Sequence, residues 1–442
     1  MIKPDSNETE PAGNTDAATA NAASAAKTDA HDPYAVLRVK DFRAFSLMRL
    51  FATLGIQVQS VVVAWQVYDL THDPLSLGLI GLSEAIPAIA VALYAGHLAD
   101  RTVRKKIIVP ALLMLLLCSL ALFTLTMTKR LALFGAVPIY IIFFIVGLTR
   151  GFLTPSTFGL LSQIIPRNLY ASAATWNSVV WQSASVIGPA FGGVIFGFYG
   201  AGISYLVDIV LIAIALGFAL WVSARPAPVR QAGESVLESL TAGIRFVFSN
   251  QIVLSAISLD LFAVLFGGAV AMLPFFASEI LTTGPQGLGL LRAAPALGAG
   301  LMAVALTFRP VGKHAGRKLL YAVAGFGVCM ILFGLSRNFY LSLVILAASG
   351  AFDSVSVVIR STLLQLFTPD HLKGRVASVN SMFIGSSNEI GAFESGVVAR
   401  LMGVVPSVVF GGAMTLAVVG VAAFRAPQLR RLNRLTGEAL PA

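Results

Sequence analysis

The chain of 442 residues contains two stretches that repeat each other at a fixed separation. Residues 160–169 read LLSQIIPRNL and residues 363–372 read LLQLFTPDHL, and alignment of Pro166 with Pro369 gives an offset of 203 residues. The same offset pairs Gly147 with Gly350, Asn177 with Asn380, Ile187 with Ile390, Gly188 with Gly391 and Gly193 with Gly396. Such a duplication predicts two similar units. In membrane proteins, repeated units commonly enclose a site on their shared axis.

Composition restricts the class of protein further. Hydrophobic residues make up 57% of the chain, charged residues make up 12%, and the mean hydropathy is +0.82. These values exclude an ordinary soluble globule of this length. The net charge of +10 is spread over short loops between apolar spans, which indicates membrane orientation rather than nucleic-acid binding. Cys118 and Cys329 each lie inside an apolar span, so neither a disulfide framework nor a cysteine-based metal site is expected. No metal and no cofactor are predicted for the chain.

Twelve apolar stretches are long enough to cross a hydrocarbon layer of ~30 Å as helices. In the first half of the chain they run over about 45–68, 75–97, 107–127, 138–161, 173–198 and 201–223. In the second half they run over about 252–280, 286–308, 319–336, 339–366, 377–400 and 404–425. Because unpaired backbone groups are costly in lipid, each span should be a helix. The predicted fold class is an all-α membrane protein with twelve transmembrane helices in two pseudosymmetric six-helix bundles.

The distribution of basic residues predicts which side of the membrane each loop faces. With both termini placed inside, 23 of the 31 Lys and Arg residues fall in inside tails and loops, 4 fall outside and 4 lie within spans. Lys and Arg concentrate on the cytoplasmic side of membrane proteins. Both termini are therefore expected in the cytoplasm, and the even number of spans agrees with this.

These boundaries give a domain plan. It consists of a disordered cytoplasmic tail at 1–32, an N-terminal six-helix bundle at 33–223, a cytoplasmic linker at 224–250, a C-terminal six-helix bundle at 251–426 and a cytoplasmic tail at 427–442. The first segment lacks an apolar core and is not expected to be a signal peptide. In the linker, Leu237, Leu240, Ile244 and Val247 recur at helical spacing and predict an amphipathic helix that connects the two bundles.

The loop after the second span carries a recognisable motif. Residues 96–106 read GHLADRTVRKK, which resembles the signature between helices two and three of the major facilitator superfamily. The resemblance implies a conformational role for Gly96, Asp100, Arg101, Arg104 and Lys105, in which the glycine permits close helix packing and the basic residues stay cytoplasmic. Val103 stands where the family usually has glycine. Residues 312–318, GKHAGRK, are a weaker echo in the second half, and simple positive-inside charge is the alternative explanation for both.

A second motif lies in the fifth span. Residues 188–193 read GPAFGG, which resembles the Gly-Pro motif of antiporter branches of the same superfamily. Pro189 can bend the helix, while Gly188, Gly192 and Gly193 let another helix approach closely. Both a hinge and simple close packing are consistent with this sequence. At the 203-residue offset the counterpart reads NEIGAFESG over 388–396, where the proline is lost and two carboxyl groups appear.

Residues 363–396, together with RAAPALG at 292–298, resemble the branch of the superfamily that includes enterobactin exporters and macrolide efflux proteins. The resemblance covers nearly the whole chain after residue 33. It implies the major facilitator fold, a bacterial inner-membrane location and efflux of a small molecule, often in exchange for protons. Similar sequences commonly have Glu where Ala392 stands here, which weakens a detailed transfer of roles to the acids of the eleventh span.

Ionisable side chains inside apolar spans are costly and are candidates for function by default. The candidates for substrate binding or coupling are Arg150, Asp353, Arg360, Glu389, Glu394, Glu84, Asp260, Gln57, Trp181 and Gln182. The polar residues among them could bind substrate or join helices. Arg49, Asp208 and Arg292 are the other ionisable residues inside spans. Asp208 is expected at the periphery, because the superfamily usually places the sixth helix there.

Two alternative ion pairs follow from the positions of these residues. At the 203-residue offset Arg150 corresponds to Asp353, and the superfamily's arrangement places these two helices across the cavity from each other. We therefore expect Arg150 and Asp353 to pair or to bracket the substrate. The alternative is a pair within one helix, because Asp353 and Arg360 lie nearly two turns apart on one face.

Proton coupling requires a carboxyl group whose protonation and conformation influence each other. Asp353 and Glu389 are favoured for this role by repeat and span position. The predicted function is a proton-coupled exporter of a small organic molecule of the drug or siderophore class, with protons and the lipid bilayer as its other partners, and with a monomeric state. An importer or facilitator with the same fold remains the alternative. An enzyme is not expected, because phosphate-loop, His-Glu-x-x-His and Gly-x-Ser-x-Gly motifs are missing from the sequence.

Overall fold

The computed structural model describes residues 34–226, 236–309, 314–369 and 372–432. The N half begins with a short 3₁₀ turn, η1 (Ala35–Arg38). Its helices are α2 (Lys40–Thr71), α3 (Pro74–Arg101), α4 (Lys105–Met127), α5 (Leu131–Phe134), α6 (Val137–Ile164), the turn η2 (Arg167–Leu169) and α7 (Tyr170–Trp221). Helix α8 (Val236–Ser249) follows. The C half comprises α9 (Gln251–Phe266), α10 (Ala269–Phe275), the π-helical turn η3 (Phe276–Ile280), α11 (Gly284–Phe308), α12 (Ala315–Leu335), α13 (Phe339–Phe367), α14 (Lys373–Met402), α15 (Val404–Arg425) and α16 (Pro427–Arg431).

Ten helices in the described ranges are long and apolar enough to span a membrane. The 52-residue α7 contains two of the predicted spans, which meet at Gly200, where φ is +76°. Helix α14 is also long enough, although it carries Glu389 and Glu394. The described residues therefore supply twelve crossings, as predicted. Gly403, between α14 and α15, has φ +93° and lies 203 residues after Gly200, so the two halves turn at equivalent glycines, which tolerate positive φ.

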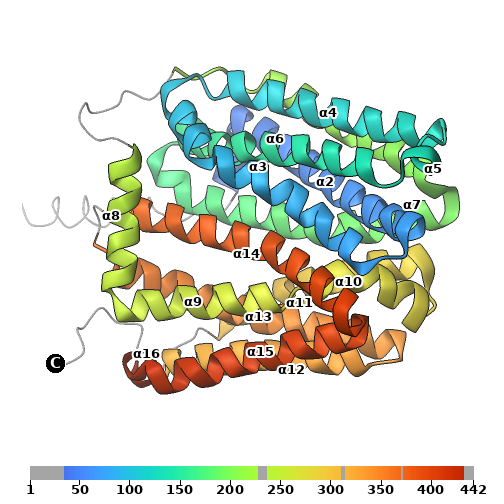
Figure 1. Ribbon diagram of the computed structural model, residues 1–442. Helices are drawn as coiled ribbons and strands as arrows, with labels where there is room; N and C mark the ends of the chain where they lie inside the picture. The colour runs from blue at the N-terminus through green and yellow to red at the C-terminus, as the bar shows by residue number, and fades with distance from the viewer. Residues whose placement is uncertain (1–33, 227–235, 310–313, 370–371, 433–442) are drawn as a thin grey trace, which may run out of the picture.

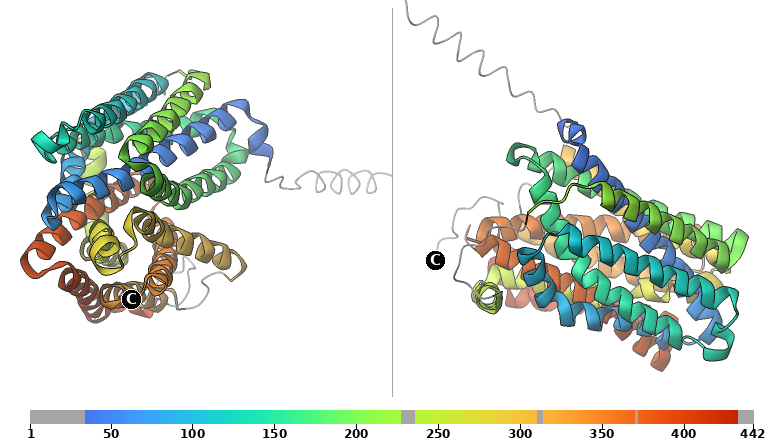
Figure 2. Two further views of the ribbon diagram at one scale, coloured as in Figure 1. Left: turned by 90° about the vertical axis from the view of Figure 1, so that its right-hand side faces the viewer. Right: turned by 90° about the horizontal axis from the view of Figure 1, so that it is seen from above.

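The two halves lie side by side, with the N half in blue to green and the C half in yellow to red (Figures 1 and 2). Within the N half, α2 packs on α7 and α3 packs on α6, and within the C half α11 packs on α13 and α12 packs on α15. The halves meet mainly where α7 contacts α11 and where α3 contacts α14. The all-α architecture of the predicted fold class is confirmed.

The two ends of the bundle differ. Helices α8 and α16 lie at one end, on the left in Figure 1, which we call the terminal end. The loops that contain α5 and the bend of α7 lie at the opposite end, which we call the far end. Helix α8 runs across the terminal end, and its buried Val247 packs in a cluster with Val253 of α9 and Val376 of α14.

Helix α16 lies in the segment predicted to be a tail. Leu429 and Leu432 are buried in a cluster with Leu319 and Ala315 of α12, so residues 427–432 fold onto the C half. The reason is visible at Gly316, where a Cβ atom would lie 1.7 Å from the carbonyl oxygen of Leu429. The absence of a side chain at Gly316 lets the terminal segment approach α12 closely.

Candidate functional site

A cavity of about 660 Å³ lies between the two halves. Both halves contribute to its lining, from α2, α3, α6 and α7 on one side and from α9 to α14 on the other. Its charged lining residues are Glu84, Arg150, Asp260, Arg292, Asp353 and Glu389. The glycines of the repeat help to position these groups, because Gly147 lies against the backbone of Glu84 and its counterpart Gly350 lies against the backbone of Pro295.

Arg150 forms an ion pair with Glu84, which brings together α6 and α3 of the N half. The Glu84 side chain is 12% exposed and that of Arg150 is 41% exposed. Arg150 and Asp353 both line the cavity, but Arg150 pairs with Glu84 and not with Asp353. The expected direct ion pair between Arg150 and Asp353 is therefore not formed in this conformation, because Arg150 meets an acid on the neighbouring helix of its own half. That the two residues bracket the substrate stays a prediction.

Arg360 forms an ion pair with Asp260, which joins α13 to α9 inside the C half. Both side chains are almost fully buried. The alternative pair within α13, between Asp353 and Arg360, is thus also replaced by a pair between helices. Seven residues along a helix span about 10 Å of rise, whereas a carboxylate on a packed neighbour meets the guanidinium directly. Asp260 lines the cavity, and Arg360 lies behind it.

Glu389 of α14 lies within electrostatic range of both arginines of the cavity. Arg150 from the N half and Arg292 from α11 each attract the Glu389 carboxylate. Arg292 also donates a hydrogen bond to Ser60 of α2 across the two halves. Glu389 therefore lies where charges from both halves converge, and a change in its charge would alter the attraction between them.

Asp353 lies on α13 between Ser349 and Ser356, and all three residues line the cavity. Their spacing of four and three residues places them on one helix face. Among the described residues, Asp353 has no ion pair and no hydrogen bond to a neighbouring side chain. The buried hydroxyl of Ser356 also has no hydrogen-bond partner there.

Other predicted site residues lie around the cavity or away from it. Gln57 lines the cavity, as does Pro189 of the Gly-Pro motif. Gln182 bridges the halves by donating a hydrogen bond to the carbonyl oxygen of Ala296. Trp181 is half exposed and Glu394 lies beside Ser395, and neither is part of the cavity lining.

Arg292 and Ser60 are polar residues inside predicted spans, but the set of site residues selected from the sequence does not include them. The sequence does mark Arg292 as a candidate for function, because it is an arginine inside an apolar span. Its position opposite Glu389 depends on how α11 packs against α2 and α14, which residue type does not specify.

Four glycines bring the halves together at the far end. A Cβ atom on Gly193 of α7 would lie 2.6 Å from the Cα of Gly289 and 2.7 Å from the carbonyl oxygen of Pro285 on α11. A Cβ atom on Gly396 of α14 would lie 3.0 Å from the Cα of Gly78 and 3.0 Å from the carbonyl oxygen of Pro74 on α3. Gly193 and Gly396 are partners in the repeat, so the two contacts are equivalent. Closely packed backbones therefore close the far end.

The Gly-Pro motif contributes to this packing. Gly188 lies against Gln57 and Gly192 lies against Val58, both on α2, while the carbonyl oxygen of Pro189 faces Gly289. Close packing by this motif is thus present in the structure. A hinge at Pro189 stays a prediction.

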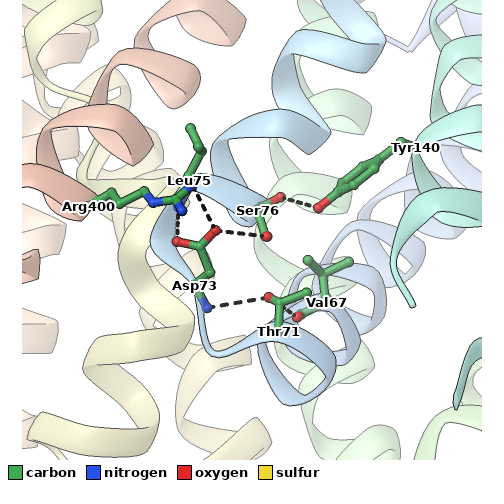
Figure 3. A network of polar contacts seen from close by, with 7 residues as sticks. All are labelled: Val67, Thr71, Asp73, Leu75, Ser76, Tyr140 and Arg400. Atoms are coloured by element: carbon green, nitrogen blue, oxygen red, sulfur yellow. Dashed lines mark hydrogen bonds and ion pairs between the residues drawn. The ribbon is translucent and has the colours of Figure 1, made fainter. Parts of the chain in front are cut away.

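Polar contacts join the halves at the same end. Asp73, the N-cap residue of α3, accepts hydrogen bonds from Ser76 and from the backbone of Leu75, and its carboxylate lies 3.7 Å from Arg400 of α14 (Figure 3). The Tyr68 hydroxyl contacts Ser278 at 2.9 Å and Glu279 at 3.0 Å. Tyr68 belongs to α2, and its partners belong to η3. We call these residues the far-end contacts.

The motif at residues 96–106 lies at the terminal end. Arg104 is buried and donates hydrogen bonds to the carbonyl oxygens of Ala99 and Gly159, so it joins the end of α3 to α6. Lys105 donates to the carbonyl oxygens of Leu220 and Val222 at the end of α7.

Arg101 and Gly96 are two further residues of this motif that the structure describes. Arg101 is exposed. A Cβ atom on Gly96 would meet no atom within 4 Å, so the expectation that Gly96 permits close packing is wrong in this conformation. The side chain of Asp100 lies outside the described part of the structure.

Two pseudosymmetric bundles with a charged cavity between them define a transporter of the major facilitator type. A model of the transmembrane secretion effector family matches residues 31–439, and the chain belongs to this family. Its members and relatives are transporters rather than enzymes. The chain is accordingly a multi-span membrane protein of a bacterial exporter family.

The chain is similar to enterobactin exporters. It is 27% identical over 384 residues to the enterobactin exporter EntS of Escherichia coli O1:K1, which covers 86% of this chain and 90% of the relative. The EntS protein of strain E24377A has the same identity and coverage.

Solved structures of other transporters share this fold. A POT family transporter in complex with 5-aminolevulinic acid matches with a TM-score of 0.70 and 11% identity, over 88% of this chain and 96% of that one. A bacterial homologue of the lysosomal transporter Spinster, in an inward-facing and unoccupied conformation, matches with a TM-score of 0.66 and 16% identity, over 91% of this chain and 98% of that one.

Proposed function

We propose that this protein is a secondary active exporter that moves a small organic molecule of the drug or siderophore class out of the cell. Export would proceed by alternating access, in which the two halves rock about the central cavity. The observation that carries this proposal is the charged cavity between halves that are closed at the far end by equivalent Gly193–Gly289 and Gly396–Gly78 contacts. The similarity to an enterobactin exporter supports the outward direction.

The proposed location is the bacterial inner membrane with the terminal end in the cytoplasm. The excess of Lys and Arg in the loops of that end supports this orientation. In it, the far end faces the periplasm, and the closed far end corresponds to an inward-facing state of the cycle.

The proposed coupling ion is the proton, and Glu389 is its proposed carrier. A protonated Glu389 would no longer attract Arg150 and Arg292, so protonation would weaken the electrostatic contact between helices of both halves. Proton entry and the conformational change would then be linked, because each alters the free energy of the other.

Reconstituted proteoliposomes with an imposed pH gradient test this function. The Glu389→Gln variant keeps the shape of the side chain but cannot carry a negative charge. We expect it to lose gradient-driven accumulation of substrate while it retains exchange of substrate down its own gradient. The substrate would be taken from a screen that compares accumulation in cells with and without the protein, repeated with a protonophore.

Asp208→Asn is the matched control for this experiment. Asp208 is a buried acid of the N half that accepts a hydrogen bond from Gln59 at 3.0 Å, away from the cavity lining. Its substitution should leave gradient-driven transport unchanged. Saturable flux that never responds to the pH gradient would identify a facilitator and contradict the proposal. Gradient-driven transport of the substrate in the direction that corresponds to uptake into the cell would also contradict it.

A further inference from the structure

The charges around the cavity do not balance within the protein. Three carboxylates are matched by arginines: Glu84 by Arg150, Asp260 by Arg360, and Glu389 by the attraction of Arg292 and Arg150. The fourth carboxylate that lines the cavity, Asp353, has no cation beside it among the described residues. An ionised carboxylate in a low-dielectric surrounding is stabilised by an opposite charge, and the described residues place none beside Asp353.

The surroundings of Asp353 combine oxygen atoms with an aromatic wall. Ser349 and Ser356 lie on the same face of α13, and the Ser356 hydroxyl is buried without a hydrogen-bond partner. Helix α12 meets α13 where Gly325 faces the ring of Phe352, the residue next to Asp353. Phe326, which follows Gly325, lines the cavity.

The ring of Phe326 is held in place by the break between α9 and α10. A Cβ atom on Gly267 would lie 2.6 Å from Cε1 of Phe326, so the glycine makes room for the ring. Met330 and Val323 extend the apolar surface along α12. The wall of the cavity on the C half therefore presents one unmatched carboxylate and an apolar, aromatic surface. An aromatic face also attracts cations.

We infer that the cavity binds an organic cation, whose positive charge pairs with the Asp353 carboxylate and whose apolar body lies against the Phe326 side of the cavity. This inference rests on the proposed function and narrows its substrate class. An anionic substrate is disfavoured, because the guanidinium groups of Arg150 and Arg360 are engaged by Glu84 and Asp260 and that of Arg292 by Glu389 and Ser60.

Equilibrium binding to the purified full-length protein tests this inference. The probe is radiolabelled tetraphenylphosphonium, a permanent lipophilic cation, and the comparison ligands are triphenylphosphine oxide, which is neutral, and tetraphenylborate, which is an anion. We expect saturable binding of the cation that neither comparison ligand displaces. Asp353→Asn should weaken binding about tenfold or more, the factor expected from the loss of a charge-assisted contact.

Asp353→Glu serves as the conservative variant, since it retains the negative charge and should keep most of the affinity. Asp208→Asn removes a buried acid away from the cavity and should leave binding unchanged. The inference is wrong if Asp353→Asn binds the cation as tightly as the unaltered protein, or if the unaltered protein does not bind the cation or binds tetraphenylborate equally well.

These outcomes can be separated from failure of the proposed function. If tetraphenylphosphonium binds through Asp353 but no pH gradient drives its movement in proteoliposomes, proton-coupled export is wrong and the cation site stands. If a pH gradient drives export of a neutral or anionic compound and the cation does not bind, the cation site is wrong and the proposed function stands.

Discussion

The ion pair between Asp260 and Arg360 is nearly sealed from solvent, with side chains 8% and 5% exposed. Removal of one partner from a buried pair leaves an uncompensated charge, which costs about 3–5 kcal/mol, whereas replacing both partners with apolar residues is often neutral. We expect Arg360→Met to lower the thermal unfolding midpoint of the detergent-solubilised protein by several degrees. The double variant Asp260→Leu/Arg360→Met should lose much less. Equal losses in the single and double variants would show that the pair itself, and not the unpaired charge, determines the stability.

At the scale of helices, the close approach of the two halves at the far end depends on four residues that lack side chains. We expect Gly193→Leu to keep α7 and α11 apart and to shift the protein towards a state open at the far end, with loss of transport. Electron spin resonance distances between labels at Leu133 and Leu401, which are both 81% exposed at that end in opposite halves, would then lengthen. The labelled protein would carry Cys118→Ser and Cys329→Ser, since both native cysteines are free.

Gly217→Leu is the matched control on the same helix, because a Cβ atom there would meet nothing within 4 Å. This variant should give the distances of the parent protein. Unchanged distances in Gly193→Leu would mean that α7 and α11 can separate by local adjustment, without opening the far end.

At the scale of the whole molecule, the proposed orientation predicts which surface an impermeant reagent can reach. Arg337 is exposed between α12 and α13 at the far end, and Arg317 is exposed near the start of α12 at the terminal end. We expect Arg337→Cys to react with an impermeant maleimide in intact spheroplasts, and Arg317→Cys to react only after permeabilisation. The reverse pattern would invert the protein in the membrane and assign the closed far end to the cytoplasm.

The architecture was predictable because a few positions determine it. The twelve apolar spans fix the helices, and the offset between Pro166 and Pro369 reappears in the structure as the matching turns at Gly200 and Gly403. The sequence alone could not identify α16 as packed, because its apolar residues are few and their burial depends on the glycine at position 316.

The cavity was predictable in its residues but not in its pairs. Hydrophobicity makes Glu84, Arg150, Asp260, Asp353 and Glu389 conspicuous, and all five line the cavity. The partner of each arginine depends on which neighbouring helix carries an acid at the same depth in the membrane. An acid displaced by one helical turn would no longer meet the same arginine. The repeat suggested an ion pair across the halves, whereas Arg150 and Arg360 each form an ion pair with an acid of their own half.

Helix α8 packs on the C half, where its Val247 lies in a cluster with residues of α9 and α14. The 14 residues from 222 to 235 separate it from the end of α7, and a chain of this length reaches ~45 Å when fully extended. The halves also touch directly, through α7 against α11 and α3 against α14. A movement of one half can therefore reach the other through these packed surfaces as well as through the covalent connection.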